Sequence, residues 1–559
     1  GIPASSGSAG EAQVAPLQIT VTVCDRLRPS RRLTLVTMPS TRNKNEFQEV
    51  LDEVRATYES GATRPLSWRK AALAGALQMI SENVDAMADA LMSDVGGGKV
   101  RVIGEMFSVP NIELMLKNLD KWAADEKMPH EYALGRSFVR KEPKGVVLII
   151  GAWNFPINLI MSPLAAVLAA GNCAVIKPSE MSPATAKLLG ELLPRYLPSD
   201  AVRIVQGSTK ETSALLELRW DHIMYTGSTM VGKIVMAAAA KHMTPVTLEC
   251  GGKCPVFVDK TANISTAVAR LLFLKYTFNA GQICISPDYV LCDKEVEEAF
   301  LEELVKQTKE SLGTTREEAW GPSDLQRMYG KIVNGKHVER LRKMVLSSGG
   351  KVVLGDPNDA DAEACWFPPT CVSRPDAGSP LLTDEVFGPV LSVVPVSGVD
   401  EAIGKAKTIC ASPLHLYVFS EDSRYVETVL GATASGMVTV NDVGGSHGIH
   451  LPFGGVGESG MGSYGGKAGF DQFSHRRGVL VRSTAAFMPK TDFPPPVKGK
   501  VPAWLYSFAM KIVITGFIPK PLKTPLKLGL GAVLLAVAYK LARDGGLVAW
   551  VMQFLARLA

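Results

Sequence analysis

Apolar positions recur with two different periods along the chain. The first helical pattern is marked by five apolar residues, Phe47, Val50, Leu51, Val54 and Tyr58. Their spacing predicts a helix over residues 45–60, and similar patterns predict helices within 68–95 and 102–123. At residue 146 the period changes, because Val-Val-Leu-Ile-Ile is a continuous apolar run typical of a strand buried on both faces.

From residue 146 onward, predicted strands alternate with predicted helices. The strands are expected at 146–150, 173–177, 202–205, 222–225 and 246–249. The helices between them are expected at 162–170, 183–193 and 228–241. This alternation predicts a doubly wound α/β sheet. A second α/β pattern runs from Ile264 to about Val440, so the predicted fold class is α/β with two domains.

Composition describes an ordinary globular protein of more than one domain. The 559 residues exceed a single core, and 46% of them are apolar and 21% charged. The nine cysteines are odd in number and irregularly spaced, at positions 24, 173, 250, 254, 284, 292, 365, 371 and 410. They form no C-x-x-C motif and no zinc-like pattern with histidine, so we expect free thiols, a reducing compartment and no metal site.

The basic excess of the chain belongs to its C-terminus. Residues 493–559 hold seven Lys, two Arg and one Asp, a net charge of +8. The whole chain is +5, which leaves residues 1–492 at −3. A mildly acidic body argues against nucleic acid as a partner.

The two ends of the chain differ in composition from the body. Residues 1–37 contain four Arg near their end and few acids, which is typical of a transit peptide, but they lack its amphipathic pattern. Met38 is an alternative first residue. At the other end, Pro494, Pro495 and Pro496 form a stiff linker that can continue neither a helix nor a central strand.

The tail beyond the prolines is basic and apolar. Its apolar stretches are 503–518, 528–539 and 547–555. The middle stretch would be about 18 Å long as a helix, whereas a span needs roughly twenty residues. Interfacial helices, or a shallow hairpin broken at Gly545-Gly546, therefore fit better than a single span. The alternative is a C-terminal helix packed on the body of the protein or on a second copy of the chain.

One cysteine stands in a distinctive run, Asn279-Ala280-Gly281-Gln282-Ile283-Cys284. A cysteine alone is most often an inert, buried small hydrophobe. Here it is accompanied by six further motifs in order: Trp153-Asn154-Phe155-Pro156, Lys177-Pro178-Ser179-Glu180, Thr226-Gly227-Ser228, Glu249-Cys250-Gly251-Gly252-Lys253, Glu385-Val386-Phe387-Gly388-Pro389 and Pro452-Phe453-Gly454-Gly455. Together the seven resemble the aldehyde dehydrogenase superfamily, over about residues 44–485.

The resemblance implies a catalytic set of three residues. Cys284 would attack the aldehyde as a thiolate to give a thiohemiacetal, whose oxygen would be held by the Asn154 amide and the backbone N–H of Cys284. Loss of hydride would leave a thioester. Glu249, at the end of an apolar strand, would activate the water that hydrolyses it. Enzymes of this superfamily that transfer the acyl group to coenzyme A generally lack this glutamate.

The resemblance also implies an NAD site, with NADP possible, in which a single Gly-Ser-Thr turn replaces the usual G-x-G-x-x-G. Ser228 lies at an expected helix N-cap, where free N–H groups favour a diphosphate. The implied cofactor-binding residues are Lys177, Glu180, Gly227, Ser228, Gly232, Glu385 and Phe387. A carboxylate at Glu180 would accept ribose hydroxyls but repel a 2′-phosphate, which predicts a preference for NAD.

Further motifs resemble the class 3 and fatty aldehyde dehydrogenase branch. They are the runs at 435–442, 451–457, 459–462 and 474–477. The branch implies a long-chain or apolar aldehyde substrate, a homodimer paired through a bridging element, and a membrane-bound C-terminus with a helix near the substrate entrance, for which 504–517 is the matching stretch. It also implies residence on the cytoplasmic side of an intracellular membrane such as the endoplasmic reticulum, with organellar targeting by the N-terminal extension left open.

The predicted organisation therefore has five parts. They are an extension at 1–43, a Rossmann-like NAD(P)-binding domain at 44–246 with part of the bridging element near 121–143, a catalytic domain at 247–434, a bridging element at 435–490, and a linker and tail at 491–559. Two alternative functions stay open: a coenzyme A-acylating enzyme, disfavoured by Glu249, and a non-catalytic membrane-associated scaffold, disfavoured by the intact Asn154 and Cys284. Fatty aldehydes, apocarotenals and aromatic aldehydes all fit as substrates.

One motif has no explanation from the sequence. The run Asp94-Val95-Gly96-Gly97-Gly98-Lys99 is unusually rich in glycine for a region of helices.

Overall fold

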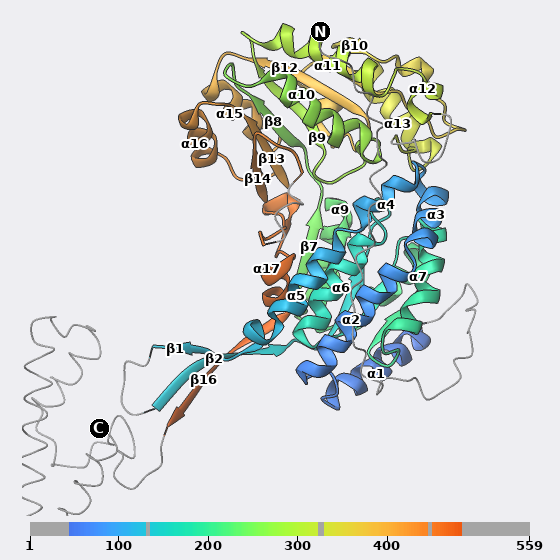
Figure 1. The fold of residues 1–559 in the computed structure, drawn as a ribbon, viewed down its shortest axis with the longest axis vertical. Helices are drawn as coiled ribbons and strands as arrows, with labels where there is room; N and C mark the ends of the chain where they lie inside the picture. Colours follow the sequence, from blue (N-terminus) through green and yellow to red (C-terminus); the bar gives the residue numbers. More distant parts are fainter. Residues whose placement is uncertain (1–43, 130–134, 322–328, 445–449, 483–559) are drawn as a thin grey trace, which may run out of the picture. The chain divides into compact units, whose positions relative to one another are not determined.

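A computed structural model describes residues 44–129, 135–321, 329–444 and 450–482 (Figure 1). The N-terminal extension and the C-terminal linker and tail lie outside the described residues, and so do the predictions about targeting and membrane binding. The chain divides into two compact units. Of the described residues, 44–128 and those from 138 to 479 belong to the first unit, and 129, 135–137 and 480–482 belong to the second.

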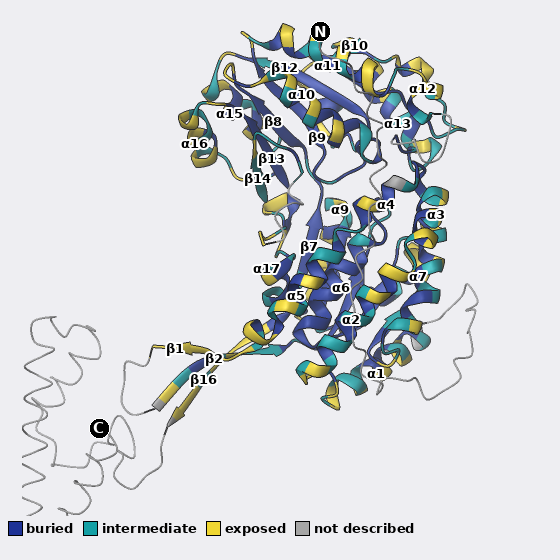
Figure 2. Cartoon of the chain, in the orientation of Figure 1, coloured by how far each residue is buried: buried dark blue, intermediate teal, exposed yellow. Residues whose placement is uncertain are grey.

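A six-stranded sheet forms the first half of the large unit. Its strand order is β15-β7-β6-β3-β4-β5, parallel except for β15. The strands are β3 (Val146–Ile150), β4 (Cys173–Lys177), β5 (Val202–Ile204), β6 (His222–Gly227), β7 (Val246–Cys250) and β15 (Gly460–Met461). Figure 2 shows that the parallel strands are buried. All five predicted strands of this region are confirmed.

Helices cover both faces of this sheet because the strand side chains alternate. Val147 and Ile149 of β3 join one apolar cluster, whereas Val146, Leu148 and Ile150 join another. The first cluster is completed by α2 (Leu66–Glu82), α3 (Val84–Val95), α5 (Ser108–Ala123), α6 (Asn158–Ala170), α7 (Pro183–Tyr196) and α17 (Gly466–Gln472). The second is completed by α1 (Lys44–Glu59), α8 (Thr209–Leu216) and α9 (Thr229–Ala240).

A seven-stranded sheet forms the second half. Its order is β10-β11-β12-β9-β8-β13-β14, with only β10 antiparallel to its neighbour. The strands are β8 (Cys254–Val258), β9 (Pro287–Asp293), β10 (Lys351–Leu354), β11 (Thr370–Ser373), β12 (Val390–Val396), β13 (His415–Phe419) and β14 (Met437–Val440). The helices of this half are α10 (Ile264–Leu272), α11 (Glu297–Ser311), α12 (Arg316–Trp320), α13 (Gly335–Leu346), α14 (Pro380–Thr383), α15 (Val399–Ile409) and α16 (Ser423–Ala432).

A third sheet of three strands has the order β1-β2-β16. Its strands are β1 (Glu126–Met128), β2 (Gly135–Pro143) and β16 (Ser474–Arg482). The predicted bridging element draws on both β2 and β16, whereas β14 pairs in the seven-stranded sheet. The predicted α/β fold class is confirmed, and the five domain boundaries stay predictions.

Two helical patterns contain breaks that periodicity did not show. The pattern over 68–95 divides at Asn83 into α2 and α3. The pattern over 102–123 divides into a short helix, α4 (Val102–Glu105), and α5. Helix α8 was not predicted, although Ser208 and Glu211 form a capping box at its start. None of the helices among the described residues is both long enough and apolar enough to cross a membrane.

Candidate functional site

The predicted nucleophile lies on a tightly constrained turn. Asn279, Ala280 and Gly281 all have positive φ angles, of 57°, 47° and 71°. A Cβ atom on Gly281 would lie 2.4 Å from the Gly388 carbonyl oxygen, so only glycine fits there. Positive φ in two consecutive non-glycine residues is a strain typical of functional sites. The turn presents Cys284, which is half-buried.

The predicted oxyanion donor is held against this turn. The side-chain Nδ2 of Asn154 donates to the carbonyl oxygen of Gln282 at 3.1 Å. The carbonyl oxygen of Asn154 accepts from Nδ2 of Asn279 at 3.1 Å. Gln282 in turn donates from Nε2 to the Lys331 carbonyl at 2.8 Å. The structure therefore brings Asn154 and the Cys284 turn together, as predicted for a shared oxyanion site.

The predicted base, Glu249, is buried at the end of β7. Neither carboxylate oxygen has a hydrogen-bond partner among the described residues. Burial therefore raises the pKa of Glu249 well above its usual value. Burial raises the pKa of the Cys284 thiol to about 12, with further contributions from the charges of Glu385 and Glu249. The negative charge of Glu249 is therefore one of the causes that raise the pKa of the Cys284 thiol.

Four of the predicted cofactor residues, Lys177, Glu180, Gly227 and Ser228, end or follow strands at the carboxyl edge of the six-stranded sheet, where open α/β sheets bind ligands. Lys177 ends β4, and its buried Nζ donates to the Pro178 carbonyl at 2.7 Å and to Oε2 of Glu180 at 3.1 Å. Glu180 is 44% exposed. Gly227 ends β6, and Ser228 is the N-cap of α9, where its hydroxyl accepts from Val231 N at 3.4 Å.

These residues fit a nicotinamide dinucleotide. The N-terminus of α9 offers free N–H groups to a diphosphate. Gly227 and Gly232 are required by close packing, because added Cβ atoms would lie 2.2 Å from the Tyr225 hydroxyl and 2.9 Å from the Cys250 sulfur, respectively. Lys177 and Glu180 would hold the adenosine ribose, and Glu385 and Phe387 would hold the nicotinamide end. A nicotinamide dinucleotide would supply a hydride acceptor to this site.

Three further residues, Lys253, Asp288 and Arg340, hold the segment that carries Glu385 and Phe387. The motifs had assigned no role to them. Lys253 donates to Oδ1 of Asp288 at 2.5 Å and to the Leu381 and Asp384 carbonyls. The other oxygen of Asp288 accepts from Val386 N at 3.0 Å, and Arg340 donates to the Val386 carbonyl at 2.7 Å. Lys253 belongs to a quoted motif, but nothing in the sequence indicates its partner.

These hydrogen bonds hold the segment that is predicted to bind the nicotinamide end of the cofactor. Phe387 has a positive φ of 44° and packs edge-on against Trp153, with ring centroids 5.6 Å apart. The pKa of Glu385 is raised to about 7, chiefly by burial and also by the negative charge of Asp288, while the Gly252 N–H opposes the rise. The strained conformation is sustained by the contacts on both sides of Val386.

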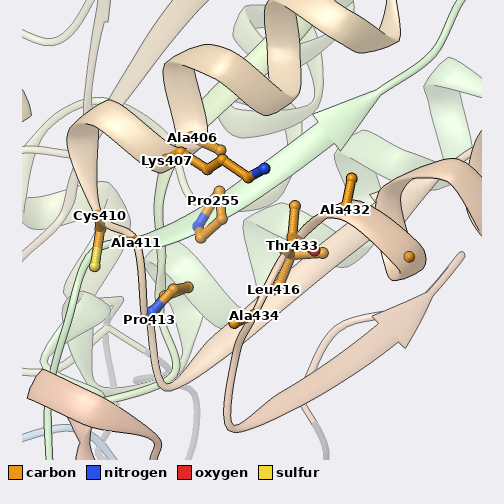
Figure 3. Close-up of a pocket in the computed structure, with 11 residues that line it drawn as sticks. Pro255, Ala406, Lys407, Cys410, Ala411, Pro413, Leu416, Ala432, Thr433 and Ala434 are labelled. Atoms are coloured by element: carbon orange, nitrogen blue, oxygen red, sulfur yellow. The ribbon is translucent and has the colours of Figure 1, made fainter.

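Two other features lie apart from these residues. A cavity of about 400 Å³ lies beside α15, α16 and β13 (Figure 3). It is lined by Pro255, Ala406, Lys407, Cys410, Ala411, Pro413, Leu416, Gly431, Ala432, Thr433 and Ala434, none of them a predicted site residue. Within the described ranges, all eight cysteines are free, and no three His, Cys, Asp or Glu side chains are placed to hold a metal ion.

Cys284 lies on a turn beside an amide donor, and the carboxyl edge of the six-stranded sheet suits a dinucleotide. Together these features define a class of proteins, the nicotinamide-dependent oxidoreductases that act through a cysteine. Comparison with known proteins narrows the class. The family model described as "Aldehyde dehydrogenase family" matches residues 20–479. The chain is 41% identical over 444 residues to the "Aldehyde dehydrogenase, dimeric NADP-preferring" of Canis lupus familiaris, covering 78% of this chain and 95% of that protein.

Two further comparisons agree. The chain is 42% identical over 441 residues to "Aldehyde dehydrogenase family 3 member B1" of Homo sapiens, covering 78% of this chain and 91% of the relative. A solved structure of AldH from Staphylococcus aureus in a substrate-bound state matches with a TM-score of 0.76 at 34% identity, over 82% of this chain and 99% of that one. The chain belongs to the aldehyde dehydrogenase family. It is an NAD(P)-dependent aldehyde dehydrogenase with relatives in family 3.

Proposed function

We propose that the protein oxidises apolar aldehydes to free carboxylic acids, through a thioester on Cys284. Cys284 adds to the aldehyde carbon, and the Asn154 amide with the Cys284 N–H holds the resulting oxyanion. After hydride loss, Glu249 takes a proton from the water that attacks the thioester. The presence of Glu249 favours hydrolysis over transfer to coenzyme A, because a carboxylate at the end of β7 supplies a base for water.

The proposal of an apolar substrate rests on three aromatic rings that stack in a row. Phe155 follows the oxyanion donor in the chain, and its ring stacks on Phe278 with centroids 5.7 Å apart. Phe278 stacks in turn on Phe273 at 5.6 Å. Phe155 is buried, whereas Phe273 is 49% exposed. Apolar ring contacts therefore extend from the residue beside Asn154 to Phe273, which presents apolar surface to solvent.

The substrate proposal predicts that efficiency rises with the apolar surface of the aldehyde. Each buried CH₂ group contributes about 0.8 kcal/mol, so kcat/KM should rise by roughly three- to fourfold per added methylene until the apolar surface is filled. The measurement is a panel of straight-chain aldehydes of graded length, with apocarotenals and aromatic aldehydes alongside. A preference for short or polar aldehydes would contradict the proposal.

We further propose that NAD is preferred over NADP. Glu180 would accept ribose hydroxyls, and its carboxylate would repel a 2′-phosphate even though Lys177 offsets part of its charge. The canine relative is named NADP-preferring, so the outcome is informative in either direction. Glu180→Gln should raise kcat/KM for NADP relative to NAD by about tenfold, on the scale of one lost charge repulsion. A wild-type preference for NADP would overturn the assignment.

The remaining proposals concern partners. We propose a homodimer, supported by the word "dimeric" in the name of the canine relative. We also propose that residues 493–559 bind the cytoplasmic face of an intracellular membrane such as the endoplasmic reticulum, supported by their +8 charge and their three apolar stretches. Liposome flotation of the full chain against a chain truncated at Phe493 tests the second proposal. Equal solubility of both at low salt would contradict it.

A further inference from the structure

The glycine run after α3 is explained by a close approach of two backbone segments. Gly96 and Gly97 have positive φ angles of 66° and 76°. Gly96 forms an isolated antiparallel bridge with Gly330, and Lys331 N donates to the Val95 carbonyl at 3.0 Å. A Cβ atom on Gly96 would lie 2.6 Å from Cγ of Lys331. Side chains at these positions would therefore force the two segments apart.

The turn made by the glycines places Arg101 against the oxyanion donor. Arg101 is only 7% exposed, and its Nη2 donates to the carbonyl oxygen of Asn154 at 2.9 Å. Its Nη1 donates to the Val95 carbonyl at 3.3 Å, which ties the guanidinium to the glycine turn itself. A Cβ atom on Gly97 would lie 3.3 Å from Cδ of Arg101, so this turn and this side chain are packed together.

A second charged residue of the same short segment holds the other end of the Asn154 loop. Glu105 is fully buried, and its Oε2 accepts from the backbone N–H groups of Ile157 at 3.1 Å and Asn158 at 2.7 Å. Those N–H groups begin α6. Arg101 and Glu105 therefore bind the two ends of the segment that carries Asn154.

Burial of the charged side chains of Arg101 and Glu105 in the core is unfavourable. Burial lowers the pKa of Arg101 to about 10 and raises that of Glu105 to about 7. Among the described residues, Nε of Arg101 and Oε1 of Glu105 have no hydrogen-bond partner. A buried charge costs free energy unless its polar atoms are hydrogen-bonded, and both residues spend their hydrogen bonds on backbone groups. The contribution of Arg101 and of Glu105 is therefore to place the backbone that each one binds.

The segment that packs against the glycine turn also contacts the turn that carries the predicted nucleophile. Lys331, which contacts the glycine turn, accepts from Nε2 of Gln282 through its carbonyl oxygen. Val333 N donates to Oε1 of Gln282 at 2.9 Å. Gln282 is two residues before Cys284. The segment that packs against the glycine turn thus holds Gln282, close to the Cys284 N–H, while Arg101 holds the backbone of Asn154.

We propose that Arg101, delivered by the glycine turn, is a positioning residue of the oxyanion site. By fixing the peptide carbonyl of Asn154, it aims the side-chain amide of that residue at the aldehyde oxygen. The inference rests on the proposed role of Asn154. Its effect falls on thiohemiacetal formation and hydride loss, and not on cofactor binding.

The test is the rate of the first NADH burst in Arg101→Met, Arg101→Lys and a matched control. Misplacement of a catalytic group by about 1 Å can cost about 10²-fold. Arg101→Met should slow the burst by about tenfold to a hundredfold, with NADH binding and the aldehyde KM within about twofold of wild type. Arg101→Lys should restore part of the rate, because an ammonium still donates to the carbonyl. Lys99→Met is the control, since Lys99 is 42% exposed and its ion pair is with Asp89.

A double-mutant cycle separates positioning from a general structural effect. Arg101→Met should add little to the slow burst of Asn154→Ala, because it acts through that residue. Gly97→Ala should reproduce Arg101→Met, whereas Gly378→Ala, which meets open space, should not. An unaltered burst in Arg101→Met, or fully additive effects, would overturn the proposal alone. An unaltered burst in Asn154→Ala would remove the oxyanion assignment and the proposal with it.

Discussion

Cys284→Ala is expected to abolish aldehyde oxidation while cofactor binding persists. Removal of a nucleophile acts on the scale of roughly 10⁴-fold or more in kcat. The turn that presents Cys284 is held by Gly281 and by Gln282, not by the sulfur, so the fold should tolerate the change. The measurement is steady-state NADH formation together with NADH binding by fluorescence.

A matched control is available on the neighbouring strand. Cys254 is buried, and its sulfur lies 3.4 Å from the carbonyl oxygen of Cys284, yet no catalytic role is assigned to it. Cys254→Ser should keep turnover well above that of Cys284→Ala. Turnover retained by Cys284→Ala, or lost equally in the two variants, would remove the nucleophile assignment.

Glu249→Gln is expected to separate the two halves of the reaction. The first turnover should still release NADH, but steady-state turnover should fall by about 10²- to 10⁴-fold, the contribution of a general base. The thiol should also become more acidic, because one of the charges that raise its pKa is gone. The measurement is stopped-flow NADH absorbance, in which a burst followed by a stalled phase is expected.

The pH dependence follows from the same carboxylate. Burial raises the pKa of Glu249, so a larger share of it is protonated near neutrality and cannot accept a proton from water. The deacylation rate should therefore rise with pH in the wild type, and this rise should be lost in Glu249→Gln. A deacylation rate that falls with pH in the wild type would assign the base elsewhere.

The elements that the sequence predicted well are those whose local pattern of apolar and capping residues is enough to indicate a buried strand or a helix start. The continuous apolar run at 146–150 forms β3, because each of its residues is buried on one face of the sheet or the other. Ser228 was predicted as a helix cap from its place between an apolar strand and a helical pattern, and it caps α9. Such signals are local, so a single sequence carries them.

The parts that were missed depend on contacts between distant segments. Arg101 and Glu105 border a helical pattern, where charged residues are usually solvent-exposed, yet both are buried against the Asn154 loop. The glycine run was noticed but could not be explained, because its reason is the approach of Gly330 more than two hundred residues away. Asp288 was overlooked for the same reason, since its partners Lys253 and Val386 come from other segments.

The central claim is that oxidation proceeds through a thioester on Cys284 that Glu249 helps to hydrolyse. The most direct measurement is mass spectrometry of Glu249→Gln after mixing with NAD and an apolar aldehyde, followed by peptide mapping. The account predicts one acyl group per chain, with the mass of the aldehyde less one hydrogen in place of the thiol hydrogen, on the peptide that contains Cys284. An unmodified Cys284 under conditions where NADH has been released, or an acyl group on another residue, would contradict it.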